Sequence, residues 1–209
     1  MKIVVFGASR GVGLKVVEQA LEAGHIVTAF VRTPAKFTVQ HPNLIVCQGD
    51  SMDAAVVEKA IAGQDAVIST LGPTRPPIPG MMETSAKNIV AAMKKHGVKR
   101  LVSTTGAGVR QPEDQPKLAD HLIGTLLNLL AKNVVLDSAA NVKVIQGSDL
   151  DWTIVRFPRL LDGEPTGNYR FGYVSKDSST QLSRADAAAS VLKELTEKRW
   201  VRKLPLVSY

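Results

Sequence analysis

The stretch Lys-Ile-Val-Val-Phe-Gly-Ala-Ser-Arg-Gly-Val-Gly, residues 2–13, decides the fold of this chain. Residues 3–6 form a short apolar run that is typical of a buried strand, and residues 12–23 carry apolar side chains at helical spacing. The glycines between them let the chain turn tightly, and they bring backbone N–H groups and a helix N-terminus to a point where a phosphate can bind. This segment therefore predicts a strand, a phosphate-binding turn and a helix.

Strand and helix patterns continue to alternate along the rest of the chain. We expect strands at residues 2–6, 26–31, 44–47, 66–70, 99–104, 152–157 and 204–208. We expect helices at residues 12–23, 54–61, 81–96, 120–131, 134–147 and 184–198. Such alternation predicts one α/β domain over residues 1–209, with a Rossmann-type, doubly wound and mostly parallel sheet covered on both faces.

Two irregular stretches are expected beside a substrate pocket. The first is a loop at residues 106–119, and the second, residues 162–183, has short strands near 169–174. Long irregular segments in a compact domain are often binding loops. We therefore expect the small C-terminal addition at about residues 158–183 to line the pocket.

The composition limits the functions that the chain can have. Its 209 residues include one cysteine, and no stretch approaches the roughly 20 apolar residues that span a membrane. Since no export signal precedes the first strand, we expect a cytoplasmic protein without a disulfide. The net charge is +7, and basic residues gather at residues 94–100 and 198–203, which we interpret as solvated helix ends. Aromatic residues make up 5% and are not interleaved with these groups, which argues against a nucleic-acid partner.

The glycine turn and the residue after the second strand together predict NADP(H) as cofactor. The turn residues expected to hold the diphosphate are Gly7, Ser9, Arg10, Gly11 and Val12. An NAD-binding protein usually has a carboxylate after the second strand, whereas this chain has Arg32, with Lys36 nearby. A cation there pairs with a 2′-phosphate that a carboxylate would repel. The alternative is that Arg32 is a solvated strand end.

The ends of the third and fourth strands supply further candidates for the cofactor site. Asp50 and Ser51 follow the third strand, where the Asp50 carboxylate can accept a hydrogen bond from the adenine amine or can cap the next helix. Leu71 and Gly72 follow the fourth strand, where a small, open backbone lets the cofactor ribose pass over the sheet.

Motifs along nearly the whole chain carry a resemblance to a known family. They are GASRGVG, VRTPAKF, GDS, AVISTLG, KNIVAAMKKHGVKRLV, LDWTIVRFPRL, DGEPTGNY and LSRADAA. With these motifs the chain resembles the atypical short-chain dehydrogenases/reductases of the NmrA-like, NAD(P)H-binding kind, and within them the biliverdin-IXβ reductase and flavin reductase group. The resemblance implies NADPH binding and, in many members, hydride transfer to flavins or other acceptors.

The same resemblance implies which residues lie beside the nicotinamide. These are Leu71, Gly72, the strand end from Thr104 to Gly106, Pro158 and Arg159. The chain departs from the flavin reductase group at two of them: Gly106 stands where that group has a serine after the fifth strand, and Arg159 stands where it has a histidine after the proline.

The catalytic residues are less well defined by the sequence than the cofactor site. Tyr169, Tyr173 and Tyr209 are the tyrosines, and none has a lysine four residues later, which argues against the Tyr-x3-Lys route of carbonyl reduction. The hydroxyls of Thr104 and Thr105 are candidate donors to the acceptor, or they make ordinary strand-end hydrogen bonds.

Arg159 is a candidate to hold an anionic group of the acceptor, or it makes a surface ion pair; His121 is a candidate acid, or a solvated loop residue. Two interpretations follow, with no metal in either. One is an NADPH-dependent oxidoreductase acting on a small-molecule acceptor such as a flavin or quinone. The other is a non-catalytic NADP(H)-binding redox sensor that docks a protein partner. A nucleotide-linked epimerase or dehydratase is a weaker third, since the catalytic tyrosine is absent.

Overall fold

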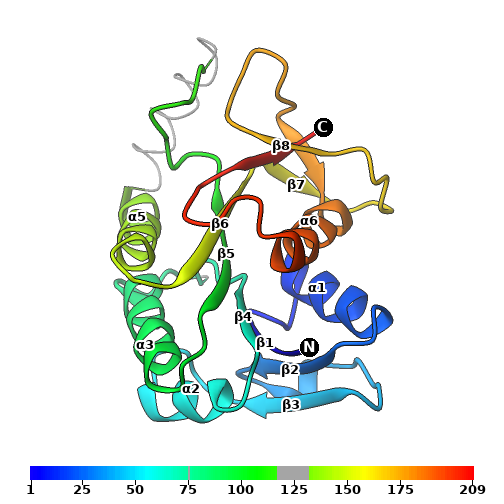
Figure 1. Cartoon of the computed structure of the whole chain (residues 1–209), viewed down its shortest axis with the longest axis vertical. Helices are drawn as coiled ribbons and strands as arrows, with labels where there is room; N and C mark the ends of the chain where they lie inside the picture. The colour runs from blue at the N-terminus through cyan, green and yellow to red at the C-terminus, as the bar shows by residue number, and fades with distance from the viewer. Residues whose placement is uncertain (75, 117–131) are drawn as a thin grey trace.

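A computed structural model describes residues 1–74, 76–116 and 132–209. Within these residues eight strands form one sheet, in the order β3-β2-β1-β4-β5-β6-β10-β8 (Figure 1). In that order their bounds are Leu44–Gln48, Ile26–Val31, Lys2–Phe6, Ala66–Ser69, Arg100–Gly106, Asp151–Phe157, Leu206–Ser208 and Arg170–Gly172. Neighbouring strands run parallel except β8, which is antiparallel to β10.

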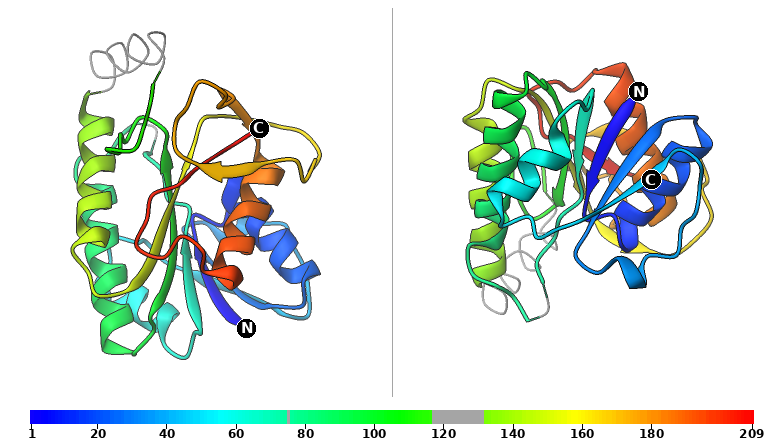
Figure 2. Two further views of the ribbon diagram at one scale, coloured as in Figure 1. Left: turned by 45° about the horizontal axis from the view of Figure 1, so that its top comes forward. Right: turned by 90° about the horizontal axis from the view of Figure 1, so that it is seen from below.

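Helices cover both faces of the sheet. One face carries α1 (Gly11–Glu22) beside α6 (Arg184–Glu197), and the other carries α2 (Ala54–Ile61), α3 (Met81–Lys95) and α5 (Lys132–Gln146) (Figure 2). The short helix η1 (Pro34–Lys36) follows β2. This architecture confirms the predicted Rossmann-type fold.

The apolar run in β1 is explained by this two-sided cover. Ile3 and Val5 belong to the core beneath α1 and α6, whereas Val4 and Phe6 belong to the core beneath α2 and α3. Because successive side chains of a strand point to opposite faces, a strand covered on both faces has to be apolar at every position. All four residues are fully buried.

Some predicted boundaries differ from the structure. Strand β5 extends to Gly106, so Thr104, Thr105 and Gly106 end a strand that was expected to stop at residue 104. Two short strands at the ends of the segment expected at about residues 158–183, β7 (Arg159–Leu161) and β9 (Gln181–Ser183), pair in parallel and form a second, smaller sheet. The helix expected at 120–131, and His121 in it, lie outside the described residues.

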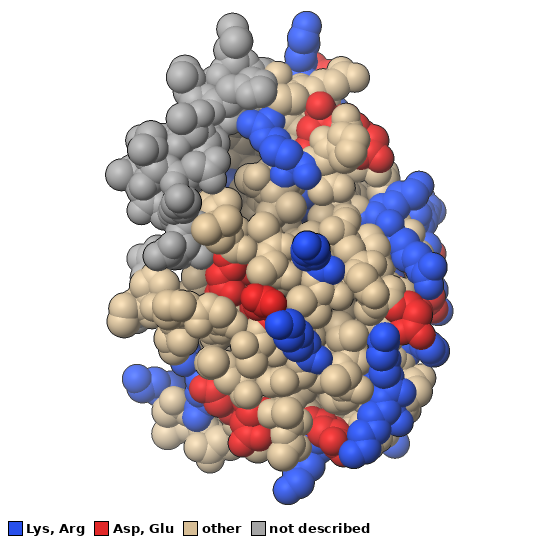
Figure 3. Space-filling model, turned by 90° about the vertical axis from the view of Figure 1, so that its left-hand side faces the viewer, with Lys and Arg blue, Asp and Glu red and all other residues tan. Residues whose placement is uncertain are grey.

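The interpretation of the basic residues at 94–100 as solvated is wrong for Arg100. Its side chain is 4% exposed, and its guanidinium pairs with Glu194 at 3.1 Å and donates to Thr153 Oγ1 at 2.9 Å. Lys94 and Lys95 are exposed and form surface ion pairs, as expected of helix-end residues. On the face shown in Figure 3, basic side chains are interspersed with acidic ones. Among the described residues, none of the helices is long and apolar enough to span a membrane.

Candidate functional site

A cavity of about 680 Å³ lies at the carboxyl ends of the parallel strands. The strand order reverses between β1 and β4, and such a switch point is where α/β sheets bind their ligands. The predicted site residues found in the cavity wall are Gly7, Ser9, Arg10, Gly11, Val12, Arg32, Asp50, Ser51, Leu71, Gly72, Thr104, Thr105, Gly106 and Pro158.

The glycine turn holds α1 tightly against the end of β4. Gly7 has a φ of +81°, and a Cβ on it would lie 2.9 Å from the backbone of Thr70. A Cβ on Gly13 would overlap the carbonyl oxygen of Gly7, so the first turn of the helix packs directly on the glycine turn. Thr70 is held there by hydrogen bonds from its N–H and its hydroxyl to the Phe6 carbonyl, at 2.9 and 3.0 Å.

The start of α1 is open towards the cavity. Arg10 is its N-cap residue, and within the described part of the chain the Arg10 side chain makes no capping hydrogen bond. The first N–H groups of a helix lack partners inside the helix and carry partial positive charge. Turn and helix start therefore fit a diphosphate: the glycines leave room for it, and the N–H groups point at it.

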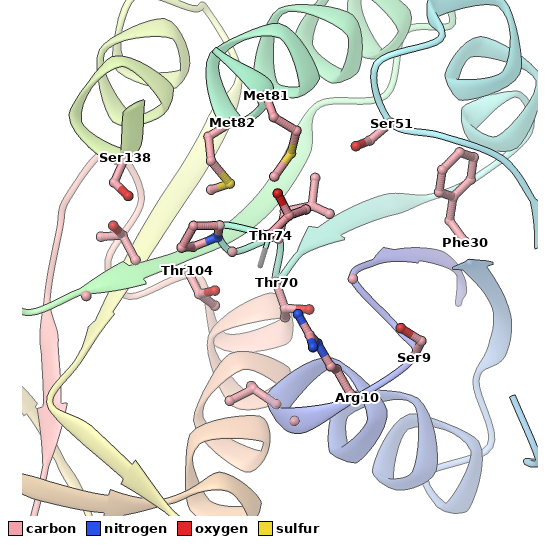
Figure 4. A pocket seen from close by; sticks show the side chains of 18 of the residues that line it. Ser9, Arg10, Phe30, Ser51, Thr70, Thr74, Met81, Met82, Thr104 and Ser138 are labelled. Carbon is pink, nitrogen blue, oxygen red and sulfur yellow. The ribbon is translucent and has the colours of Figure 1, made fainter. Parts of the chain in front are cut away.

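Two exposed arginines belong to the cavity wall, one directly after β2 and one in the glycine turn. Arg32 follows β2 directly, and Arg10 lies in the glycine turn; both are exposed and belong to the cavity wall. Figure 4 shows the Arg10 side chain reaching across the pocket towards Thr70, with Ser9 on the side of Phe30. Lys36 is also exposed, but it lies in η1 and is not among the described residues that line the cavity.

The loop after β3 decides whether Asp50 caps the next helix. The N-cap of α2 is Asp53, whose Oδ1 accepts hydrogen bonds from the N–H groups of Ala55 and Val56 at 2.9 and 3.3 Å. Capping by Asp50 is therefore wrong, and the Asp50 carboxylate instead accepts a local hydrogen bond from the Met52 N–H, at 2.9 Å. Its exposed carboxylate stays in the cavity wall, where the hydrogen bond to adenine stays a prediction.

Ser51 has a structural role in the same loop. It is buried, its hydroxyl lies 2.8 Å from the Ser85 hydroxyl, and its carbonyl accepts from the Asn88 amide at 3.0 Å. These bonds tie the loop after β3 to α3. They fix the position of the neighbouring Asp50.

The other end of the cavity combines hydroxyls with apolar side chains. Thr104 lies near the end of β5, on the same face as Val102, whereas Ser138 of α5 and Met81 and Met82 of α3 lie on the other face of the strand (Figure 4). Leu71, Ile78, Pro158 and Leu160 add further apolar surface. Ser138 was not predicted, because its place in a helical pattern carries no motif.

The two methionines are held by a helix cap supplied from a neighbouring helix. Gly80, the N-cap of α3, has no side chain, and the carboxylate of Asp137 on α5 accepts from the N–H groups of Met82 and Glu83 at 3.0 and 3.2 Å. Because Ser138 follows Asp137, the same contact places Ser138 at the cavity.

The structure does not bring Arg159 into the cavity wall. Pro158, Leu160 and Asp162 line the cavity, and they are alternate residues of an extended segment, so the intervening Arg159 faces away. Its side chain is exposed, and its N–H donates to the Thr180 carbonyl in the β7–β9 sheet. The proposed contact between Arg159 and an acceptor therefore has no support in the described geometry.

Arg184 lines the cavity and was not assigned a role from the sequence. It is the first residue of α6, and its guanidinium pairs with the carboxylate of Asp162 at 2.7 Å. The signal in the sequence was the segment Ser183-Arg184-Ala185-Asp186. There Ser183 and Asp186 form a reciprocal cap that starts the helix and places Arg184 at its first position.

Two buried carboxylates hold the segments around the cavity. Asp114 binds Arg156 through both oxygens, at 2.6 and 2.8 Å, and accepts from the Gln111 and Val174 N–H groups. Burial alone would raise the pKa of Asp114, but these hydrogen bonds, with the Arg156 charge, outweigh burial and hold it below its usual value. The loop before residue 117 is thereby tied to β6 and to residue 174.

Asp186 has the same function at the start of α6. Its carboxylate accepts from the N–H groups of Thr166 and Gly167 at 2.9 Å, and from the hydroxyls of Ser183 and Tyr209 at 3.0 and 2.8 Å. Burial opposes ionisation here too, but the hydrogen bonds outweigh it and keep the pKa of Asp186 below its usual value. Tyr209 is thus a structural residue that helps to hold the segment beside the cavity.

Comparisons with known proteins agree with this geometry. A family model described as NAD(P)H-binding matches residues 7–198. The uncharacterized protein YwnB of Bacillus subtilis is 27% identical over 93% of this chain and 92% of its own length. A candidate exported protein of Burkholderia pseudomallei is 29% identical, with full coverage of both chains and a TM-score of 0.79. The anaerobillin reductase ChuY of Escherichia coli O157:H7 is 22% identical over 100% of this chain and 97% of its own, with a TM-score of 0.78, and shares the fold.

Proposed function

Because this chain belongs to the NAD(P)H-binding family, we propose that it is an NADPH-dependent oxidoreductase that transfers hydride to a flavin or a similar planar acceptor. The observation that carries the proposal is the continuity of the cavity. One cavity joins the open start of α1 and two exposed arginines to a chamber with apolar walls and hydroxyl groups. The first part suits a phosphorylated dinucleotide and the second suits a flat ring.

The choice of NADPH over NADH rests on charge at the end of β2. Arg32 borders the cavity there, and guanidinium groups bind phosphate through paired hydrogen bonds. The 2′-phosphate of NADPH would be held by the Arg32 side chain. Asp50, in the same wall, would accept from the adenine amine rather than from a ribose hydroxyl.

The residues at the other end of the cavity would orient the acceptor. The nicotinamide supplies the hydride, and the protein supplies binding and orientation. Leu71, Gly72 and Gly106 leave space at the strand ends, and nothing described lies within 4 Å of a Cβ built on either glycine. Met81 and Met82 would pack against the acceptor ring, while the Thr104 and Ser138 hydroxyls would donate hydrogen bonds to it. The name of ChuY as a reductase is consistent with this class of reaction.

The proposal is tested by mixing the purified protein with NADPH and with FMN, riboflavin or a quinone, and following the absorbance of the reduced nicotinamide. We expect oxidation of NADPH with at least one of these acceptors. Thr104→Val keeps the shape of the side chain and removes its hydroxyl. Because one hydrogen bond to a developing charge is lost, the turnover number should fall by about tenfold. The affinity for NADPH should not change. Thr196→Val, on the exposed surface of α6, is the matched control.

The same assay separates the alternative of a redox sensor. Tyr169, Tyr173 and Tyr209 are not among the described residues that line the cavity, so none of them is placed to act as an acid there. Tight binding of NADPH without oxidation by the acceptor panel would contradict the enzyme and favour a non-catalytic protein that docks a partner.

A further inference from the structure

The guanidinium of Arg184 lies at the positive ends of two helices. It belongs to the first residue of α6, and α6 packs beside α1 (Figure 2). At the start of α1, a Cβ on Gly11 would lie 3.9 Å from the Arg184 Nε. Helix N-termini favour anions and disfavour cations. A cation in this position therefore calls for an anion beside it.

The anions that the described structure offers to Arg184 are insufficient. The Asp186 carboxylate, in the first turn of α6, is already bound by the N–H groups of Thr166 and Gly167 and by the hydroxyls of Thr166, Ser183 and Tyr209. Asp162 pairs with Arg184 at 2.7 Å, but the Asp162 side chain is 96% exposed and that of Arg184 is 32% exposed. Ion pairs this exposed to solvent contribute little to stability, so this pair is readily exchanged for a stronger one.

Arg184, Asp162 and the glycine turn share one cavity. We propose that Arg184 binds the diphosphate of the dinucleotide, and that its ion pair with Asp162 breaks when the cofactor binds. This inference rests on the proposed function, because it places the diphosphate at the start of α1. A guanidinium beside Gly11 can donate two parallel hydrogen bonds to phosphate oxygens, and the diphosphate charge replaces that of Asp162.

This assignment divides the cations of the cavity between two parts of the cofactor. Arg32 would recognise the 2′-phosphate, which only NADPH has. Arg184 would recognise the diphosphate, which NADPH, NADH and ADP-ribose all share. Ligand fragments can therefore distinguish the two side chains.

The test is calorimetric titration of Arg184→Gln and of the unmodified protein with NADPH, NADH, ADP-ribose and 2′-AMP. We expect Arg184→Gln to raise the Kd of NADPH, NADH and ADP-ribose by the same factor, about tenfold. The Kd of 2′-AMP should not change. Arg32→Gln should give the reverse pattern: the Kd of ADP-ribose should not change, and the Kd of 2′-AMP should rise. Arg170→Gln, an exposed arginine outside the cavity wall, should change none of these values.

Two further variants test the exchange with Asp162. Asp162→Asn should lower the Kd of ADP-ribose by about threefold, because it removes both a competitor and a repelling charge. In the Arg184→Gln background the same change should have a smaller effect, since the competition no longer exists. Arg184→Lys keeps the positive charge but loses the paired N–H donors of the guanidinium. It should therefore weaken the binding of ADP-ribose by less than Arg184→Gln does. Thermal unfolding verifies that each variant is folded.

The inference is overturned if Arg184→Gln leaves the Kd of ADP-ribose within a factor of about two of the unmodified protein, well below the cost of a lost charged contact. It is also overturned if Arg184→Gln weakens the binding of 2′-AMP as much as that of ADP-ribose, because Arg184 would then contact the adenosine end of the cofactor. Should the unmodified protein bind neither NADPH nor ADP-ribose, the proposed function fails and takes this inference with it.

Discussion

Arg32 is the side chain on which the choice between NADPH and NADH depends. It is exposed in the cavity wall directly after β2. Arg32→Asp replaces a partner of the 2′-phosphate with a group that repels it, so the Kd of NADPH should rise by roughly 10- to 100-fold. The Kd of NADH should change by less, because NADH lacks that phosphate. Calorimetry measures both values.

A suitable control for Arg32→Asp is Lys36→Asp. Lys36 carries the same charge but lies in η1, outside the described cavity wall. Its replacement should change the two affinities only slightly. Equal losses for NADPH and NADH in Arg32→Asp would remove the argument for 2′-phosphate recognition.

Gly13 is the residue at which the phosphate turn tolerates least change. Gly13→Ala introduces a Cβ that overlaps the Gly7 carbonyl oxygen, so α1 or the glycine turn has to shift. The free energy of unfolding should fall by about 1–3 kcal/mol, the usual cost of overpacking, and NADPH binding should weaken as α1 shifts. Urea denaturation measures the first effect and calorimetry the second.

Gly72 offers a comparison in the same cavity. No described atom lies within 4 Å of a Cβ built on it. Gly72→Ala should therefore leave the free energy of unfolding almost unchanged. A comparable fall in the free energy of unfolding for Gly13→Ala and Gly72→Ala would contradict the packing argument for Gly13.

At the scale of elements, one carboxylate joins three separate segments. Asp186 at the start of α6 binds the loop at Thr166 and Gly167 and the hydroxyl of Tyr209 beyond β10. Asp186→Asn leaves several donors without a charged acceptor. It should lower the free energy of unfolding by about 2–4 kcal/mol at neutral pH, as measured by urea denaturation.

The pH dependence of this loss has a definite sign. The pKa of Asp186 in the folded protein is below its unfolded value of about 3.9, so the carboxylate stabilises the fold above that pH. That stability is lost as the pH falls through the folded pKa. The difference between the protein and Asp186→Asn should thus be constant above about pH 5 and shrink in stronger acid. A difference that grew on acidification would contradict this assignment.

The sequence predicts the elements better where they are long. The pattern at residues 54–61 matches α2 at both ends, whereas the N-cap offered to Asp50 belongs to Asp53, the residue directly before the helix. The strands β7 and β9 have three residues each, too few for a period to be visible. Their pairing decides that Arg159 faces away from the cavity, and no local pattern carries that information.

The candidate site was predictable to the extent that it is local in the sequence. The glycine turn and the residues after β2, β3, β4 and β5 lie at strand ends, and parallel strands bring such ends together. Ser138 and Arg184 reach the same cavity through the packing of α5 and α6. Because that packing depends on distant residues such as Asp137, their place could not be derived from spacing.

At the scale of the whole molecule, the cavity touches segments from residue 7 to residue 184. A ligand that binds the folded chain alone stabilises all of it. At a free concentration about 100 times its Kd, NADPH should raise the free energy of unfolding by about 2.7 kcal/mol. Urea denaturation with and without NADPH measures this increase, and an unchanged midpoint at saturation would contradict binding to the folded state.

The two ends of the cavity come from different parts of the chain. Apart from Asp162 and Arg184, the cofactor end is built from residues 7–52, whereas the acceptor end is lined by Leu71, Gly72, Met81, Met82, Thr104, Ser138, Pro158 and Leu160. Substitutions at one end of the cavity can therefore leave the residues of the other end unchanged. A chimera that keeps residues 1–70 and takes the remainder from a relative with the same fold would be expected to exchange the molecule that is reduced while retaining the source of electrons.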